Sequence, residues 1–535
     1  MQPTAFLGLG AIAAFITVKF LLHFLRMGRN AIKAKQLGCQ ELPFFNPLDV
    51  TGFWNVYGMM SADKVKAVPQ LVLQRWHDIS KKLGYPVGAM RLNVAGDTII
   101  FTSEPKNIQA MLATKFKDFS LGPRRIDNFE PLLGHGIFAA DGKDWEYSRA
   151  LLRPQFAREL VSDLDLEEVH MQNLMKALPV NPDGWTSVTD IGPLFFRLTL
   201  DSATEFLFGE SVDSQLAALP GYTAPKTAAP ERDEKAFAYS FDKAQWYLAQ
   251  GARLDTKYWL MHTKTFKQHC SEVHAFVDYF VQMALSREKG AGAPKTANGK
   301  DKYVFLNALA DETRDPVLLR DQLLNILLAG RDTTASLLSW TVWLLAQHPA
   351  VWKKLRSVIL EDFGSYEDPS ELSFSRLKSC KYLQQVINEV LRLYPVVPLN
   401  SRRSIRDTTL PRGGGPTGDA PIFVPAGTEI NYSVYVMHHR TDIWGADADD
   451  FKPERWEGRR PGWEFLPFNG GPRICLGQQF ALTEASYVLV RLLQRFDTVE
   501  GVGVDSRPVR HGLTLTDAPA DGVRVRLREA STAAA

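Results

Sequence analysis

The stretch Pro316–Gln347 carries apolar side chains around nearly all of its circumference when it is drawn as a helix. Asp315 can serve as its N-cap, Pro316 suits the first helical position, and His348-Pro349 ends the pattern. A helix of this length spans ~48 Å, far more than the average helix of a globular protein. Because almost every face is apolar, we expect this helix to cross the interior of the protein.

The middle of this predicted helix, residues 329–334, reads AGRDTT. A glycine followed by an acid and two β-branched hydroxyl residues is unfavourable helix material, so we expect a helix irregularity with a function here. The structural alternative is that a threonine bonds the carbonyl four residues back and that the aspartate forms a salt bridge.

The composition is that of an ordinary globular protein, with 45% hydrophobic and 23% charged residues. Sixty-two lysines and arginines face sixty acids, which leaves a net charge of +2 and no electrostatic footprint for nucleic acid. Residues 91–102 alternate around Gly96-Asp97 and predict a hairpin, whereas 235–260 and 382–394 have helical period. We therefore predict a mainly α fold with small β-sheets, towards the N-terminal part and after about residue 395.

The first 35 residues predict a membrane anchor. Residues 5–25 are almost entirely apolar and would form a helix ~31 Å long, which matches the hydrocarbon core of a bilayer. Basic residues follow the run and none precedes it, which places the body on the cytosolic side. A signal peptide would need its basic residues first, and a buried core helix is the other alternative. We expect a single transmembrane helix within residues 1–35 and one catalytic domain over 36–535.

Cys475 is the cysteine with a functional setting, since the four cysteines are scattered without a C-x-x-C pair. It lies in the loop FNGGPRICLG, residues 468–477, directly before an apolar helical pattern that begins near Phe480. Loop amides, the helix dipole and Arg473 would all stabilise a thiolate there. The thiolate could be a nucleophile, which would need a histidine base, or a ligand to a metal.

The loop pattern F-x-x-G-x-R-x-C-x-G resembles the haem-binding signature of the cytochrome P-450 family. Four further motifs resemble those of this family and stand in its order: W-x-x-x-R at 145–149, A-G-x-D-T at 329–333, E-x-x-R at 389–392 and P-E-R at 453–455. Together they cover roughly residues 40 to 530, and five motifs in order leave little room for coincidence. The resemblance implies a cytochrome P-450 fold preceded by the anchor, and a haem-thiolate monooxygenase.

The resemblance also implies a role for each motif residue around the haem. Cys475 would be the axial thiolate ligand of the iron, with Phe468 shielding the sulfur and Gly477 at the start of the helix whose amides bond it. The propionates of the haem would be held by a set of polar and cationic side chains. These are Trp145, Arg149, Arg402 and Arg473.

On the other side of the haem, Asp332 and Thr333 would deliver protons during oxygen activation. Glu389, Arg392 and Arg455 would form a buried structural network. Ala329 stands where animal fatty-acid ω-hydroxylases of the family often carry a glutamate that esterifies the haem, so haem should be held here without that bond.

Several stretches resemble the fungal branch that oxidises n-alkanes and fatty acids at the terminal carbon. The resemblance implies an apolar pocket lined by four segments, 120–139, 326–333, 396–399 and 513–515. The alternative is tailoring oxidation of the alkyl part of a fungal secondary metabolite by the same chemistry. A thiolate-haem isomerase or dehydratase would tend to lose the Asp332-Thr333 pair, and a haem sensor would not need it.

No flavin- or NAD-binding fingerprint is present, so electrons must come from another protein. The expected partners are an NADPH–cytochrome P-450 reductase, cytochrome b5 as an additional donor, a lipid membrane and a lipophilic small molecule, with no nucleic acid. The expected location is the endoplasmic reticulum membrane, with the catalytic domain in the cytosol.

Overall fold

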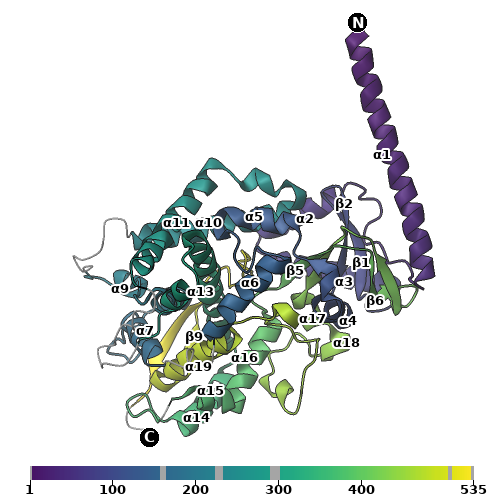
Figure 1. Ribbon diagram of the computed structural model, residues 1–535. Coiled ribbons are helices and arrows are strands. Elements are labelled where there is room, and N and C mark those ends of the chain that lie inside the picture. Colours follow the sequence, from purple (N-terminus) through teal and green to yellow (C-terminus); the bar gives the residue numbers. More distant parts are fainter. Residues whose placement is uncertain are drawn as a thin grey trace.

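The long central helix, α13 (Pro316–Gln347), lies inside a mainly helical body, and a first helix, α1 (Pro3–Gln36), projects from the edge of that body (Figure 1). The computed structural model describes residues 3–156, 164–222, 233–288, 302–370, 372–503 and 509–531. The predicted fold class, mainly α with small β-sheets, is confirmed.

Helix α13 begins and ends where its sequence signals predict. The carboxylate of Asp315 accepts hydrogen bonds from the backbone N–H groups of Val317 (2.9 Å) and Leu318 (3.2 Å), which caps the helix. Its side chains are buried along most of its length, and it packs chiefly against α8 (Ile191–Phe208). The irregularity expected at residues 329–334 is not observed, because the helix is α-helical throughout that segment.

The other helices surround α13 in the order of the chain. Those before it are α2 (Phe53–Lys64), α3 (Val68–Leu83), α4 (Pro105–Gln109), α5 (Pro123–Leu133), α6 (Gly142–Leu152), α7 (Leu164–Lys176), α9 (Ser214–Ala217), α10 (Glu234–Leu254), α11 (Lys264–Leu285) and α12 (Phe305–Glu312). Those after it are α14 (Pro349–Phe363), α15 (Phe374–Ser379), α16 (Lys381–Leu393), α17 (Val434–His439), α18 (Thr441–Trp444) and α19 (Gln478–Arg495).

Three small sheets complete the body. The five-stranded sheet has the order β1 (Ala89–Val94), β2 (Asp97–Thr102), β8 (Glu429–Ser433), β5 (Leu399–Ser404) and β3 (Phe119–Ser120). The others are β4 (Thr189–Asp190), β10 (Arg524–Glu529) and β9 (Phe496–Gly501), and the pair β6 (Thr408–Gly414) and β7 (Ala420–Val424). The predicted hairpin is confirmed as β1 and β2, and β2 pairs in parallel with β8, which joins an early and a late segment of the chain in one sheet.

The helix predicted over 235–260 is shorter than expected. Helix α10 ends at Leu254, and a 3₁₀ segment follows over Asp255–Met261. Asp255 has a positive φ of 50°, and its carboxylate is held by Arg124 at 2.9 Å. That tertiary ion pair fixes the break, which helical period alone does not reveal. The helix predicted over 382–394 is confirmed as α16.

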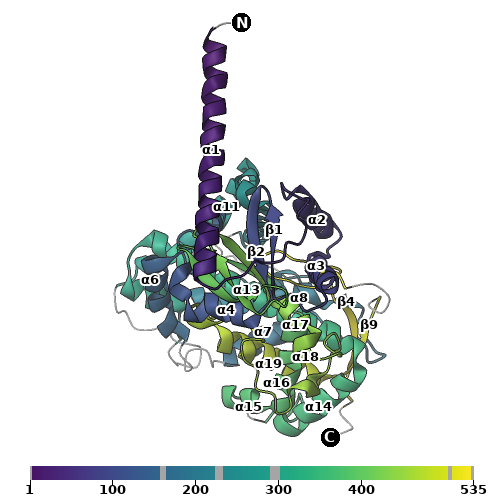
Figure 2. The same cartoon turned by 90° about the vertical axis from the view of Figure 1, so that its right-hand side faces the viewer.

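Helix α1 stands out from the body along its N-terminal length and contacts it near its C-terminal end (Figure 2). Arg26 donates to the carbonyl of Ala426 at 2.8 Å, and Lys33 forms an ion pair with Asp407 beside the β6–β7 pair. Most side chains of residues 3–20 lie outside the described part of the chain. Among the described residues, no helix combines the length and the apolar character needed to cross a bilayer. The anchor and the division at residue 35 stay predictions.

Candidate functional site

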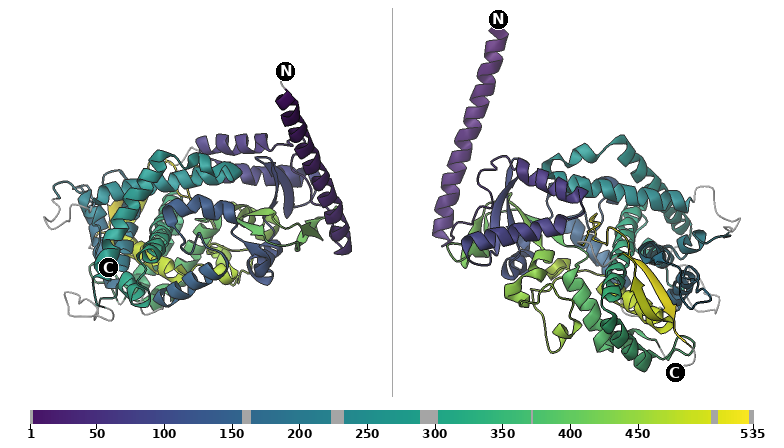
Figure 3. Two further views of the ribbon diagram at one scale, coloured as in Figure 1. Left: turned by 45° about the horizontal axis from the view of Figure 1, so that its top comes forward. Right: turned by 180° about the vertical axis from the view of Figure 1, so that it is seen from behind.

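A cavity of about 630 Å³ lies between α13, the five-stranded sheet and the loop that precedes α19. All four segments predicted to line an apolar pocket contribute to its wall. The cavity continues towards α2 and α3, which lie between α1 and the pair α10–α11 when the molecule is seen from behind (Figure 3). No histidine of the described residues lines the cavity, so the cysteine on its wall has no imidazole base there.

The cysteine loop is held in shape by its own backbone. The N–H of Cys475 donates to the carbonyl of Phe468 at 3.0 Å, and the N–H of Gly477 donates to the sulfur. Gly471 has a φ of 66°, and a Cβ there would lie 1.8 Å from the carbonyl oxygen of Leu112. The loop thus packs closely against the backbone at Leu112 and places Cys475 on the cavity wall, deep in the protein, where its side chain is accessible from the cavity.

The electrostatic setting of Cys475 suits a metal ligand better than a free nucleophile. Burial raises the pKa of its thiol, while the N–H of Gly477 and the charge of Arg149 act in the opposite direction. A bound metal cation supplies the charge that makes the thiolate stable. Burial raises the pKa of Cys270 and of Cys380 to about 12, and neither lines the cavity, so both are inert thiols.

Four arginines line the cavity close to one another: Arg125, Arg149, Arg402 and Arg473. Burial, together with the charge of Arg402, lowers the pKa of Arg473 to about 9 and that of Arg125 to about 10. Among the described residues, one carboxylate lies within ion-pair distance of this cluster. It is Asp141, which pairs with Arg473 at 2.7 Å. The Nε atoms of Arg125 and Arg402 are buried without a hydrogen-bond partner. The cluster therefore has an excess of positive charge that an anionic ligand would balance.

Trp145 brings two of these arginines together. The guanidinium of Arg473 lies 4.3 Å from the centre of the Trp145 ring, and that of Arg149 lies 5.9 Å from it. Arg149 also donates to the carbonyl of Ile474, next to the cysteine. Trp145 and Arg149 share a face of α6, as their spacing predicts, whereas Arg402 arrives from strand β5.

These residues fit a haem. The thiol of Cys475 faces the cavity on one wall, and the arginine cluster supplies the cations that two propionate groups need. Arg125, on α5, belongs to this cluster and was missed by motif reasoning, because it stands in no motif. The only sequence signal for it is a pair of arginines, Arg124-Arg125, directly after Pro123 at the start of a helical segment.

On α13, Thr333 lines the cavity, and its hydroxyl donates to the carbonyl of Ala329 at 2.6 Å. Asp332 is buried and lies 3.3 Å from Arg331, which also pairs with the half-exposed Asp242. These contacts match the structural alternative, in which the threonine bonds the carbonyl four residues back and the aspartate forms a salt bridge. The series Asp332, Arg331 and Asp242 also connects the buried carboxyl with the surface. Burial raises the pKa of Asp332 to about 6, so this carboxyl can gain and lose a proton near neutrality.

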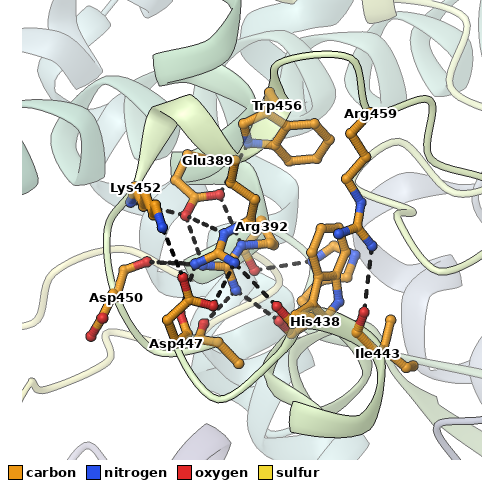
Figure 4. Close-up of polar contacts among 12 residues, drawn as sticks. Glu389, Arg392, His438, Ile443, Asp447, Asp450, Lys452, Trp456 and Arg459 are labelled. Carbon is orange, nitrogen blue, oxygen red and sulfur yellow. Dashed lines mark hydrogen bonds and ion pairs between the residues drawn. The ribbon is translucent and has the colours of Figure 1, made fainter.

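Glu389 is the centre of a buried network that involves α16 and the segment after α18 (Figure 4). Arg392 donates to both of its oxygens, at 2.9 and 2.8 Å. Arg455 donates to it at 3.1 Å and Trp456 at 3.0 Å, and the N–H of Lys452 completes the set at 3.1 Å. The predicted association of Glu389, Arg392 and Arg455 is present, and each of the three charges has a partner within the network.

A helical body with a cavity-facing cysteine loop and an unbalanced cationic wall defines a haem-thiolate protein. A sequence model of the cytochrome P450 family matches residues 66–521. The chain is 51% identical over 518 residues to "Cytochrome P450 monooxygenase g430" of Fusarium sp, covering 96% of this chain and 89% of that protein. It is 46% identical over 505 residues to "Cytochrome P450 52A6" of Candida tropicalis, covering 93% and 94%. The chain belongs to the cytochrome P450 family.

Membership of this family establishes that the protein is a cytochrome P450 monooxygenase, which uses haem with an axial cysteine thiolate, as predicted. The structure places the predicted haem residues around one cavity: Trp145, Arg149, Arg402, Phe468, Arg473, Cys475 and Gly477. Thr333 lies on that cavity, and Asp332 lies beside it on the helix. The individual roles of these residues stay predictions.

Proposed function

We propose that this enzyme inserts one oxygen atom from O₂ into a C–H bond of a long-chain aliphatic substrate, a fatty acid or n-alkane, at or near its terminal carbon. The observation that carries the proposal is the length of apolar wall beyond the cofactor residues. It includes Ile137 and Val396 as well as Val72 and Leu92 on α3 and β1. A continuous apolar wall of this kind suits a long hydrocarbon chain.

Bound haem supplies the oxygen-activating iron, and the chain's own residues hold and isolate it. Cys475 ligates the iron, and the N–H of Gly477 withdraws electron density from the sulfur. Arg125, Arg149, Arg402 and Arg473 bind the propionates, and their clustered charge is balanced when those carboxylates are present.

Proton delivery is assigned to α13. Asp332 can carry a proton near neutral pH and is connected with solvent through Arg331 and Asp242. Thr333 donates its hydroxyl hydrogen to the carbonyl of Ala329, so it must release that bond before it can pass a proton into the cavity. Thr333 is therefore a switchable member of the route and not a fixed donor.

Electrons are proposed to come from an NADPH–cytochrome P450 reductase, with cytochrome b5 as an additional donor. Attachment to the endoplasmic reticulum membrane through residues 5–25 is part of the proposal. Apolar side chains are also exposed on and before α2, including Leu48, Phe53 and Trp54. Such a surface favours contact with a lipid phase, where long-chain substrates partition.

The test is a product profile from the purified enzyme, reductase and NADPH, with saturated acids from dodecanoic to octadecanoic and the matching n-alkanes. The expected products are terminal or near-terminal alcohols. Absence of oxidation of every acid and alkane would overturn the proposal and favour tailoring of an alkylated secondary metabolite. Cys475→Ala should lose the long-wavelength carbon monoxide band of thiolate-ligated haem, whereas Cys270→Ala, a buried thiol away from the cavity, should keep it.

The proton route has a matched control on the same helix. Thr341 donates to the carbonyl of Leu337 at 2.7 Å, as Thr333 does to that of Ala329, but it does not line the cavity. Thr333→Ala should keep the haem spectrum and divert NADPH into peroxide, and Thr341→Ala should not. Equal coupling of NADPH to product in both variants would remove Thr333 from the route.

A further inference from the structure

The far part of the cavity contains a cationic side chain in apolar surroundings. Arg75 lies on α3 and lines the cavity together with apolar residues of α2, α3, β1 and β2. These apolar residues are Val56, Met59, Val68, Val72, Met90, Leu92, Val94, Ile99 and Phe101. A guanidinium in such a position is costly unless it has a function or a partner.

The partners of Arg75 leave most of its hydrogen-bonding capacity unused. Its Nη2 donates to the carbonyl of Asn55 at 3.3 Å, and its guanidinium lies 5.7 Å from the ring of Phe45. Within the described ranges, no carboxylate lies within ion-pair distance of it. Burial lowers its pKa, and the more distant charge of Asp49 only partly offsets this. Arg75 is thus a cation without a dedicated counter-ion.

Two other arginines on the same part of the wall differ from Arg75 in this respect. Arg124 is paired with both Asp97 and Asp255. Arg253 is paired with Asp63 at 2.9 Å and also donates to a backbone carbonyl. Their charges are already balanced by the protein. Arg75 is the arginine of this region whose charge remains available to a ligand.

We propose that Arg75 binds the carboxylate of a long-chain fatty acid whose hydrocarbon chain lies along the cavity towards Cys475. The inference rests on the proposed function and makes it more specific, because it names an acid as the preferred substrate class. A planar guanidinium with free N–H groups can donate two hydrogen bonds to a carboxylate. Fixing the acid end near α3 directs the methyl end towards the haem, which gives oxidation at the terminal carbon a structural reason.

The experiment compares Arg75→Gln and Arg75→Lys with the wild-type holoenzyme. Arg412→Gln is the charge-matched control, because Arg412 lies outside the cavity in an exposed pair with Asp419. The probes are dodecanoate and n-dodecane, which differ in the charged end. Binding is measured by the substrate-induced shift of the haem spectrum, and the position of hydroxylation by product analysis. The carbon monoxide band confirms that each variant is folded and loaded with haem.

Arg75→Gln should weaken dodecanoate binding about tenfold or more, which corresponds to ~1.4 kcal/mol, and should spread hydroxylation away from the terminal carbon. Its dodecane binding should stay within about twofold. Arg75→Lys should recover most of the acid affinity, and Arg412→Gln should match the wild type. Equal weakening for acid and alkane, or no weakening for either, would overturn the inference while the proposed function stands. Wild-type enzyme that oxidises neither probe class would overturn both.

Discussion

The Glu389 network and the Arg125 cluster both place charged side chains in the interior, but they balance charge in opposite ways. Glu389 accepts five hydrogen bonds from its neighbours, and Arg392 and Arg455 find their remaining partners in backbone carbonyls and Asp447. Around Arg125, four guanidinium groups gather, and in the described part of the chain Asp141 is the one carboxylate within ion-pair distance of them. The charges of the Glu389 network are balanced without a ligand, whereas those of the Arg125 cluster are balanced only when an anionic ligand is bound.

The comparison indicates how to separate structural charge from binding charge in this molecule. A fully bonded buried network holds segments of the chain together, since Arg392 donates to the carbonyls of His438 and Ala448. An unbalanced cluster with buried, unpartnered nitrogens instead stores repulsion that a ligand removes. The predictions below test whether this distinction holds, from the largest expected effect to the smallest.

Glu389→Ala should have the largest effect. It would leave the Arg392 and Arg455 charges buried without their central acceptor, at a cost of about 3–5 kcal/mol. We expect a strong loss of holoenzyme, measured as the carbon monoxide band per milligram of protein and as the urea midpoint of unfolding. Normal yield and midpoint would show that the network does not hold the fold together.

Asp332→Asn tests a buried acid with incomplete pairing. Burial raises the pKa of Asp332 from 3.8 to about 6, so the folded protein binds more protons than the unfolded chain between these values. Stability therefore falls as pH rises through this window, and the variant should gain up to about 3 kcal/mol relative to the wild type above pH ~6. Thermal unfolding across pH 4–8 measures the difference, which should shrink towards the acid end. If the stability difference between the variant and the wild type does not change with pH, the raised pKa of Asp332 is contradicted.

Arg125→Gln should weaken haem retention without harming the fold. Removing one cation relieves repulsion in the cluster but deprives a propionate of a partner, so haem release should be about tenfold faster, or ~1.4 kcal/mol. Haem transfer to an excess of apomyoglobin measures the rate. Arg412→Gln is the control, because Arg412 lies outside the cavity in an exposed pair with Asp419. Equal release rates in the two variants would place Arg125 outside the haem site.

Glu500→Gln should have the smallest effect. Glu500 pairs with Arg526 across β9 and β10, and both side chains are 45% exposed. Solvent screens such a pair, so the free energy of unfolding should change by less than about 1 kcal/mol. Urea titration measures it at low and high salt. We expect burial and full pairing to decide how much an ion pair contributes to stability. A loss of unfolding free energy as large as that of Glu389→Ala would contradict this expectation.

Sequence signals were sufficient where they act locally. The ends of α13 follow from Asp315, Pro316 and the His348-Pro349 stop, all of which act on the adjacent turn. The association of Cys475 with the predicted haem residues followed from motifs. The contacts that stabilise Glu389 needed the structure, because Trp456 and the N–H of Lys452 reach it only after the chain has folded.

Sequence reasoning failed where a distant residue decides the local conformation or charge. The end of α10 at Leu254 depends on the ion pair of Asp255 with Arg124, 131 positions away in the chain. The role of Arg125 depends on its approach to Arg402 from another element. Neither pairing leaves a mark in helical period or in a short motif, so only the folded arrangement reveals them.

The wall of the cavity draws on the chain from Asn55 to Thr516. During synthesis, which runs from the N-terminus, the cysteine loop and the turn near Leu513 leave the ribosome after the other segments that line the cavity. A growing chain therefore has no complete haem site until the turn near Leu513 has been made. Haem capture has to follow the synthesis of the whole cavity wall, and a shortage of haem would leave chains whose clustered arginines repel one another.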